Sequence, residues 1–270
     1  MVWRKPTGDG PAFIEGTVGD FNRMDFRGAF ESTLLADKAF ARFSFSSKKR
    51  DGYIDVLDFT CQMIANGTPE LAGTIPRNTS QFGSGENCKV DELGDENVQA
   101  ARVAFRYVAN DRLEFNLTGD ISDEDTRSQP DKTLAINPAL GLLADPMIGY
   151  NPVVLQPRFG VSFDERFVTN DPFTTYASFE DPINGLETPN ISTIMHWGVH
   201  GTLDYNLTDN LSLKATVGHR KFDASFGRDS DGSPLPINHT FDRFVHVQDS
   251  YELRLNGLHF GGGTDSTVGG

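Results

Sequence analysis

Two histidines, His196 and His200, have the i, i+4 spacing that chelates zinc when both lie on one helix. The residues around them, however, alternate between apolar and polar types as a strand does. On an extended strand this spacing separates the two side chains by roughly 13 Å, because each residue advances the chain by about 3.3 Å. The pair therefore cannot share one metal ion, and we interpret it as part of a polar face.

Two acidic patterns were tested in the same way. Asp229-Ser230-Asp231-Gly232 is similar to the centre of a calcium loop. With its glycine as the invariant one, the first and twelfth ligand positions fall on Gly227 and Asn238, which supply no carboxylate. Glu114 and Asp120 share one face of a predicted strand but lie about 20 Å apart, too far for a glycosidase pair. The sequence predicts no enzyme, no cofactor and no metal site.

The two cysteines, Cys61 and Cys88, fall in one predicted loop, residues 48–97. In an oxidising compartment they are well placed for a single disulfide. In the chain-entropy view, closing a loop of this size contributes about 3 to 4 kcal/mol. Two unpaired thiols remain the alternative if the compartment is reducing.

The elements that carry these residues follow a regular rhythm. Short links (34–38, 109–111 and 208–210) alternate with long ones (48–97, 122–194 and 223–249). In an up-and-down meander every second connection lies at the same end of the sheet, so one end carries tight turns and the other carries long loops. Transmembrane β-barrels have this asymmetry. Eight segments are predicted as strands: residues 12–21, 24–33, 39–47, 98–108, 112–121, 195–207, 211–222 and 250–257.

The strands themselves favour the same class. In residues 112–121 apolar and polar side chains alternate without a break, which gives a strand one apolar and one polar face. A soluble antiparallel sheet with one face on a core shows this pattern too. Three features favour a membrane: strands of about ten residues, full charges on the polar face, and aromatic residues near strand ends. These aromatic residues include Phe43, Phe45, Tyr107 and Tyr205.

Composition narrows the possible partners. The net charge is −14, which makes nucleic acid an improbable partner. Hydrophobic residues make up 37% of the chain, and no run approaches the roughly 18 to 20 apolar residues of a transmembrane helix. Residues 122–194 hold eleven acidic and four basic residues, a net charge of −7. We interpret this segment as a solvated, ordered loop rather than a metal-attracting funnel.

Seven stretches of the chain match one known family in order. The stretch VWRKPTGD (2–9) is followed by FNRMDFRGAF (21–30), ARFSFSSKKRDGY (41–53), DENVQAA (95–101), LEFNLTGD (113–120), LTDNLSLKATVGHRKFD (207–223) and SYELRLNG (250–257). The first resembles the end of the plug domain of TonB-dependent outer-membrane receptors, where KPTGD leads into the barrel. The others are similar to barrel strands of that family.

The resemblance implies a partial transmembrane β-barrel, all-β, with about eight strands out of about 22. Residues 1–11 would be the end of the plug and the plug–barrel linker, and residues 12–270 the N-terminal part of the barrel. It further implies a Gram-negative outer membrane, contact with membrane lipid, and TonB-dependent uptake of a scarce ligand such as a ferric siderophore. A TonB box and most of the plug are missing from the sequence, so we expect a fragment of a longer protein. Residues of the type that such loops use for ligands are Tyr150, Arg158, Phe159 and Tyr176.

Two other interpretations remain open at this stage. A complete small outer-membrane barrel could be built from eight strands, the smallest common number. A soluble β-sandwich that binds carbohydrate or protein would also use alternating strands. The first eleven residues contain no apolar segment of a signal peptide, which agrees with a fragment. At the other end, residues 261–270 are rich in glycine and predict no strand.

Overall fold

A computed structural model describes residues 4–77, 88–137, 145–181, 185–235, 237–259 and 264–270. Its main feature is an antiparallel sheet of nine strands in the order β1-β2-β3-β6-β7-β9-β10-β11-β12. Strands that follow one another in this order are hydrogen-bonded neighbours, so the sheet is an up-and-down meander. The predicted fold class, an all-β partial barrel, is confirmed. The strands are β1 (Phe13–Gly19), β2 (Arg23–Leu35), β3 (Ala39–Arg50), β6 (Glu96–Asn110), β7 (Leu113–Thr126), β9 (Ser192–Thr208), β10 (Leu211–Asp229), β11 (His239–His259) and β12 (Thr264–Gly269).

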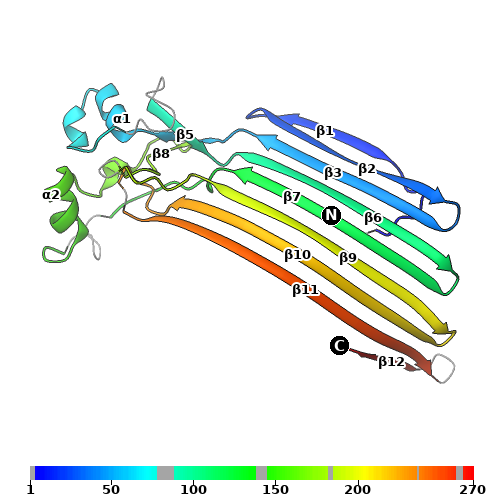
Figure 1. Cartoon of the computed structure of the whole chain (residues 1–270). Coiled ribbons are helices and arrows are strands. Elements are labelled where there is room, and N and C mark those ends of the chain that lie inside the picture. Colours follow the sequence, from blue (N-terminus) through cyan, green and yellow to red (C-terminus); the bar gives the residue numbers. More distant parts are fainter. Residues whose placement is uncertain (1–3, 78–87, 138–144, 182–184, 236, 260–263) are drawn as a thin grey trace.

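The two ends of the sheet differ as expected. Tight turns join β2 to β3, β6 to β7 and β9 to β10 at one end. The opposite end carries what we call the loop layer, the described parts of residues 51–95, 127–191 and 230–238 (Figure 1). A second sheet of three short strands lies in this layer, with β4 (Ile54–Leu57) between β5 (Lys89–Leu93) and β8 (Thr174–Thr175). Its helical segments are α1 (Phe59–Ala65), η1 (Pro69–Ala72), η4 (Asn151–Leu155), α2 (Gln156–Phe159) and η5 (Glu165–Phe167).

The structure corrects the predicted loop at residues 223–249. β10 continues to Asp229 and β11 already begins at His239, so only residues 230–238 form the connection. Here charged residues stand on the face that is apolar nearer the turns, as in the ion pair between Arg243 and Asp223 (3.1 Å). They remove the alternation on which the sequence prediction depended. Residues 264–269, predicted to lack a strand, form β12 by pairing with β11.

The two faces of the nine-stranded sheet have opposite character. One, the apolar face, carries Leu117 of β7 and the residues that the strand register puts on the same side. Its side chains are open to the surroundings, with exposed fractions of 51% for Val103, 51% for Leu117, 44% for Val199, 52% for Val217 and 54% for Leu253. The other, the polar face, carries Glu114, Asn116 and the residues aligned with them. Among the described residues no second layer covers the apolar face.

The hydrophobic cores lie in the loop layer, not under the sheet. The larger one is built around Phe59, Leu155, Phe167, Tyr176 and Leu235, all at most 7% exposed. The rings of Phe59 and Phe167 meet edge to face, with their centroids 5.0 Å apart, an arrangement that aromatic pairs prefer. A smaller core holds the three-stranded sheet together and includes Val56, Val90, Leu93 and Phe179. The long connections are therefore a packed unit on the end of the sheet.

In the described part of the chain, none of the helices has the length and apolar character needed to cross a membrane.

Candidate functional site

The N-terminal segment lies against the polar face, and Glu31 of β2 holds it there. The carboxylate of Glu31 is fully buried and accepts hydrogen bonds from the backbone amides of Thr7 (3.1 Å), Gly8 (3.2 Å) and Gly10 (3.3 Å). Arg42 of β3 balances its charge at 2.6 Å. Hydrogen bonds to an ionised group are the strong ones in proteins, so one side chain fixes the whole Thr7–Gly10 turn.

Glycine is required at two positions of this turn. Gly8 has φ of +84°, and a Cβ built on it would stand 2.2 Å from Thr33 Oγ1 and 2.7 Å from the ring of Phe40. At Gly10 a Cβ would stand 2.4 Å from the carboxyl carbon of Glu31. A side chain at either position would push the segment off the sheet, because both glycines approach it closely and Gly8 also has a positive φ.

Lys5 makes the second attachment. Its ammonium group lies 2.6 Å from Glu114 of β7 and 3.4 Å from Asp204 of β9. Glu114 also binds Arg106 at 2.7 Å, and Arg106 lies within 3.5 Å of the carbonyl of Pro6. Carboxylates of β7 and β9, Arg106 of β6 and the N-terminal segment are thus joined in one network on the polar face.

Replacing Glu31 with glutamine is expected to release the N-terminal segment. The side-chain NH₂ group of glutamine is a donor and cannot accept from the amides of Thr7, Gly8 and Gly10. The hydrogen bonds to a charged acceptor, worth about 1.5 to 3 kcal/mol each, would be lost. Hydrogen exchange at Thr7, Gly8 and Gly10 should accelerate by roughly tenfold or more. Glu15→Gln is the control, since Glu15 is exposed on the same face and binds only the side chain of Arg27. Unchanged exchange in Glu31→Gln would contradict the assignment.

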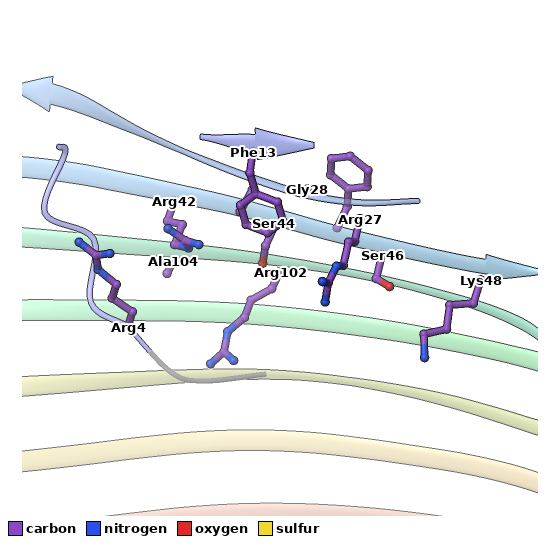
Figure 2. Close-up of a pocket in the computed structure, with 12 residues that line it drawn as sticks. Arg4, Phe13, Arg27, Gly28, Arg42, Ser44, Ser46, Lys48, Arg102 and Ala104 are labelled. Carbon is purple, nitrogen blue, oxygen red and sulfur yellow. The ribbon is translucent and has the colours of Figure 1, made fainter. Parts of the chain in front are cut away.

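Beside this attachment the polar face is hollowed into a basic pocket of about 400 Å³. Five cations line it: Arg4 from the N-terminal segment, Arg27 of β2, Arg42 and Lys48 of β3, and Arg102 of β6. Figure 2 shows Arg27, Lys48 and Arg102 extending to the side of the sheet on which the segment with Arg4 lies. No acidic residue lines the pocket in the part of the chain that the structure describes. Small side chains, among them Ser44, Ser46 and Ala104, leave the space open.

The four residues proposed from the sequence for ligand contact lie together in the loop layer but in different environments. Phe159 and Tyr176 are buried in the larger core, at 4% and 7% exposed, and Tyr150 packs against that core. Burial raises the pKa of the Tyr176 phenol above its ordinary value. Only Arg158 is exposed, with its guanidinium 5.4 Å from the centroid of the Phe159 ring. In this structure Phe159 and Tyr176 pack in the larger core, and Arg158 is the most exposed of the four.

Cys61 and Cys88 are joined by a disulfide, with their Cα atoms 5.6 Å apart. Cys61 lies in α1, whose start is capped by the carboxylate of Asp58 accepting from the Cys61 amide (2.6 Å). Cys88 directly precedes β5. The bridge therefore connects the helix that carries Phe59 to the three-stranded sheet.

A polar cluster fastens the loop layer to the sheet. Arg127, which follows β7, lies 2.9 Å from Asp91 of β5 and 3.1 Å from Glu92. Asp91 is 6% exposed and also accepts from the side-chain amide of Asn190 (2.7 Å), which precedes β9. A buried carboxylate is tolerated only with a cation and hydrogen bonds of this kind. The cluster fixes the ends of β7 and β9 to the loop layer.

The histidines and aspartates whose spacing is similar to that of metal ligands lie on the polar face and at the tip of a hairpin. His196 and His200 lie on β9, four residues apart on the polar face. Asp229 accepts from the amide of Ser178, and Asp231 from those of Ser233 and Asn238, so these carboxylates shape the tip of the β10–β11 hairpin. Within the described ranges no group of three or more His, Cys, Asp or Glu side chains is placed to hold a metal ion.

Sequence reasoning missed Glu31, Arg127 and the basic pocket. Each depends on residues far apart in the sequence, such as Glu31 and Thr7, 24 positions apart, or Arg127 and Glu92, 35 positions apart. The KPTGD stretch predicts a plug–barrel junction, but it carries no signal of which strand residue binds it.

Comparison with solved structures identifies the fold. The ferric yersiniabactin uptake receptor FyuA from Yersinia pestis is similar over 98% of this chain and 30% of its own, with a TM-score of 0.57 and 13% identity. The ferric-catecholate import receptor Fiu from E. coli K12 gives 98% and 34%, TM-score 0.54 and 9% identity. FpvA of P. aeruginosa, solved with bound pyoverdines, gives 98% and 27%, TM-score 0.52 and 11% identity. The chain has the fold of a section of these receptors.

The chain spans about a third or less of the length of each of these structures. No protein-family profile matches the sequence, and no curated protein sequence does either. At these identities the likeness concerns the fold of the backbone.

Proposed function

We propose that the chain is part of an outer-membrane receptor that takes up a scarce ligand in a TonB-dependent manner, and that the ligand is a ferric siderophore. The observation that carries the proposal is the exposed apolar face of the nine-stranded sheet. Side chains such as Val103, Leu117 and Val217 are half open to the surroundings, yet they form one continuous band across neighbouring strands. Lipid is the environment in which such a band is stable.

The alternatives from the sequence are less well supported. A soluble sandwich would bury the apolar face under a second sheet, whereas the only other described sheet, β5-β4-β8, lies in the loop layer. A complete eight-stranded barrel would pair its first and last strands. Among the described strands, β1 pairs with β2 alone and β12 with β11 alone. Both edges need further strands, because an unpaired edge in lipid costs several kcal/mol per unsatisfied group.

The rest of the assignment follows from the placement of the N-terminal segment and the loops. Residues 1–11 would be the end of a plug, since residues 5–10 are tied to the polar face that a plug-filled lumen would present. The loop layer would then lie outside the cell, where its disulfide is stable. A ferric siderophore as ligand rests on what the similar receptors are described as importing. TonB would act on parts of the protein beyond this chain.

An arginine at Leu117 is expected to destabilise the membrane-inserted chain by about 2 to 4 kcal/mol, the cost of a charge near the middle of the apolar band. Thr202→Arg is the matched control, because Thr202 stands on the polar face opposite Asn116 and next along that face to Asp204. The fraction of each variant recovered in membranes rather than in aggregates measures the effect. Equal recovery of the two variants would show that the apolar face does not meet lipid.

Uptake tests the function itself. A strain lacking the complete reading frame that contains this sequence is grown without iron and given ⁵⁵Fe bound to catecholate, hydroxamate or mixed-ligand siderophores in turn. The proposal predicts that uptake of at least one complex is lost and is restored by the wild-type gene. It also predicts that the restored uptake is lost when TonB is deleted. Unchanged uptake of every iron complex tested would reject a ferric siderophore as the ligand.

A further inference from the structure

The basic pocket on the polar face contains more positive charge than its surroundings neutralise. Of its five cations, Arg27 is bound by Glu15 (2.7 Å) and Arg42 by Glu31 (2.6 Å). The other three, Arg4, Lys48 and Arg102, form no ion pair with any described carboxylate. Three uncompensated cations around one cavity repel one another, and an anion between them relieves that repulsion.

The acidic residues that stand opposite two of these cations in the strand register form their ion pairs with other cations. Asp120 stands directly opposite Arg102 in the β6–β7 register, but its carboxylate is bound by Arg220 of β10 at 3.1 Å. Asp25 stands directly opposite Lys48 in the β2–β3 register, but its ion pair is with Arg23, which binds Oδ2 at 2.6 Å. Lys48 and Arg102 therefore each face an acidic residue across the strands without forming an ion pair with it.

The shape of the cavity suits a small molecule. A volume of about 400 Å³ is in the range of small-ligand sites. Its floor is made of short residues, Gly28, Ala29, Ser44, Ser46 and Ala104, and the two serines offer hydroxyl groups within it. Guanidinium groups bind carboxylate and phosphate oxygens in pairs, with fixed geometry. Arg27 and Arg42 are already oriented by their own partners, so part of the ordering cost of binding is met in advance.

We propose that this pocket binds a small polyanion, a molecule with at least two phosphate- or carboxylate-type groups, between Arg102, Lys48 and Arg4. The inference rests on the proposed function only for placing the pocket in the lumen. Binding itself needs neither transport nor TonB. The site would hold anionic molecules against the inner wall of the barrel, near the attachment of the N-terminal segment at Glu31.

The first test is binding of inorganic pyrophosphate and of citrate to the complete receptor that contains this sequence, folded in detergent micelles, measured by calorimetry. The double variant Arg102→Gln/Lys48→Gln is expected to lose affinity by at least about tenfold, because it removes charge-assisted donors from the site. The control double variant Arg112→Gln/Lys38→Gln removes the same charge at the tight-turn end and should stay within about twofold, since charges that far away are screened. Circular dichroism checks that both variants keep the sheet.

A second test needs no variant. Phenylglyoxal modifies accessible arginines, and mass spectrometry reports the rate at each one. Pyrophosphate should slow modification of Arg102 and leave that of Arg112, at the tight-turn end, unchanged. The proposal is overturned if the wild-type chain binds neither anion, if both double variants lose affinity equally, or if Arg102 is not protected. It is also overturned if a glutamate-rich peptide binds more tightly than either anion, because the surface would then belong to a protein segment.

Discussion

Replacing Phe59 with alanine is expected to destabilise the loop layer by about 3 to 5 kcal/mol, the usual cost of deleting a buried aromatic ring. Phe59 is 2% exposed, and its ring meets those of Phe167 and Tyr176 edge to face, with centroid distances of 5.0 and 5.1 Å. These contacts join α1, η5 and the segment after β8, three parts of two separate connections. The cavity would therefore loosen both long connections together.

Native-state proteolysis measures this effect. Cleavage within residues 58–75 and 155–177 should accelerate by roughly a hundredfold or more, since each 1.4 kcal/mol changes the open population about tenfold. Ile64→Ala is the control, because Ile64 lies on the same helix but is 53% exposed, and its loss should cost under about 0.5 kcal/mol. If Phe59→Ala and Ile64→Ala were cleaved at the same rate, the core in the loop layer would not be a packed unit.

Replacing Arg127 with methionine is expected to cost about 3 to 5 kcal/mol, because it leaves a buried carboxylate without its cation. Asp91 is 6% exposed and lies 2.9 Å from Arg127 Nε. Methionine keeps much of the side-chain volume, so the loss is electrostatic rather than one of packing. The loop layer should then separate from the ends of β7 and β9, which hydrogen exchange at β5 and at residues 126–128 would detect.

A double-mutant cycle separates this effect from a general loss of charge. Asp91→Asn in the Arg127→Met background should recover part of the stability, because the uncompensated charge is gone while the bond from Asn190 can be kept. Arg166→Met is the matched control. Among the described carboxylates Arg166 pairs with Asp164, a partially exposed neighbour in the same loop, and such pairs contribute about 0 to 1 kcal/mol. Its other hydrogen bonds are long ones, to the carbonyls of Leu71 and Ser162 at 3.4 Å. Additive losses in the Asp91 and Arg127 variants would rule out the coupling.

The strands could be predicted from the sequence where one face is purely apolar and the other purely polar. β7 and the first part of β10 satisfy this. The predicted range 211–222 lies within β10, and the predicted range 112–121 starts one residue before β7. The prediction failed where the strands extend beyond the apolar band. Near the loop layer, the side of β10 and β11 that is apolar closer to the turns carries the ion pair between Asp223 and Arg243. The alternation of apolar and polar residues ends there, although the strands continue to pair by hydrogen bonds. β12 was missed because its residues pair with β11 through the backbone, with little apolar signal of their own.

The loop layer is harder to predict for a different reason. Its cores combine residues from connections that no local pattern relates, such as Phe59 and Tyr176. Aromatic residues in a long loop therefore gave the same signal whether they pack inside, as Phe159 does, or remain partly open, as Tyr150 does. The attachment of the N-terminal segment could be predicted only in part. Its glycines were visible in the sequence, but their partner Glu31 is one of several charged residues on the polar face, and only the strand register brings it beneath them.

The most direct test of the central claim, that the apolar face meets lipid and the polar face meets water, is a spin-label scan of residues 213–217 on β10. Both native cysteines are in the disulfide, so one introduced cysteine at a time gives a single labelled site. In lipid vesicles, collisions with oxygen should peak at 213, 215 and 217, and collisions with a water-soluble nickel chelate at 214 and 216. Equal access of the chelate to all five positions would contradict a lipid-facing sheet and with it the proposed receptor.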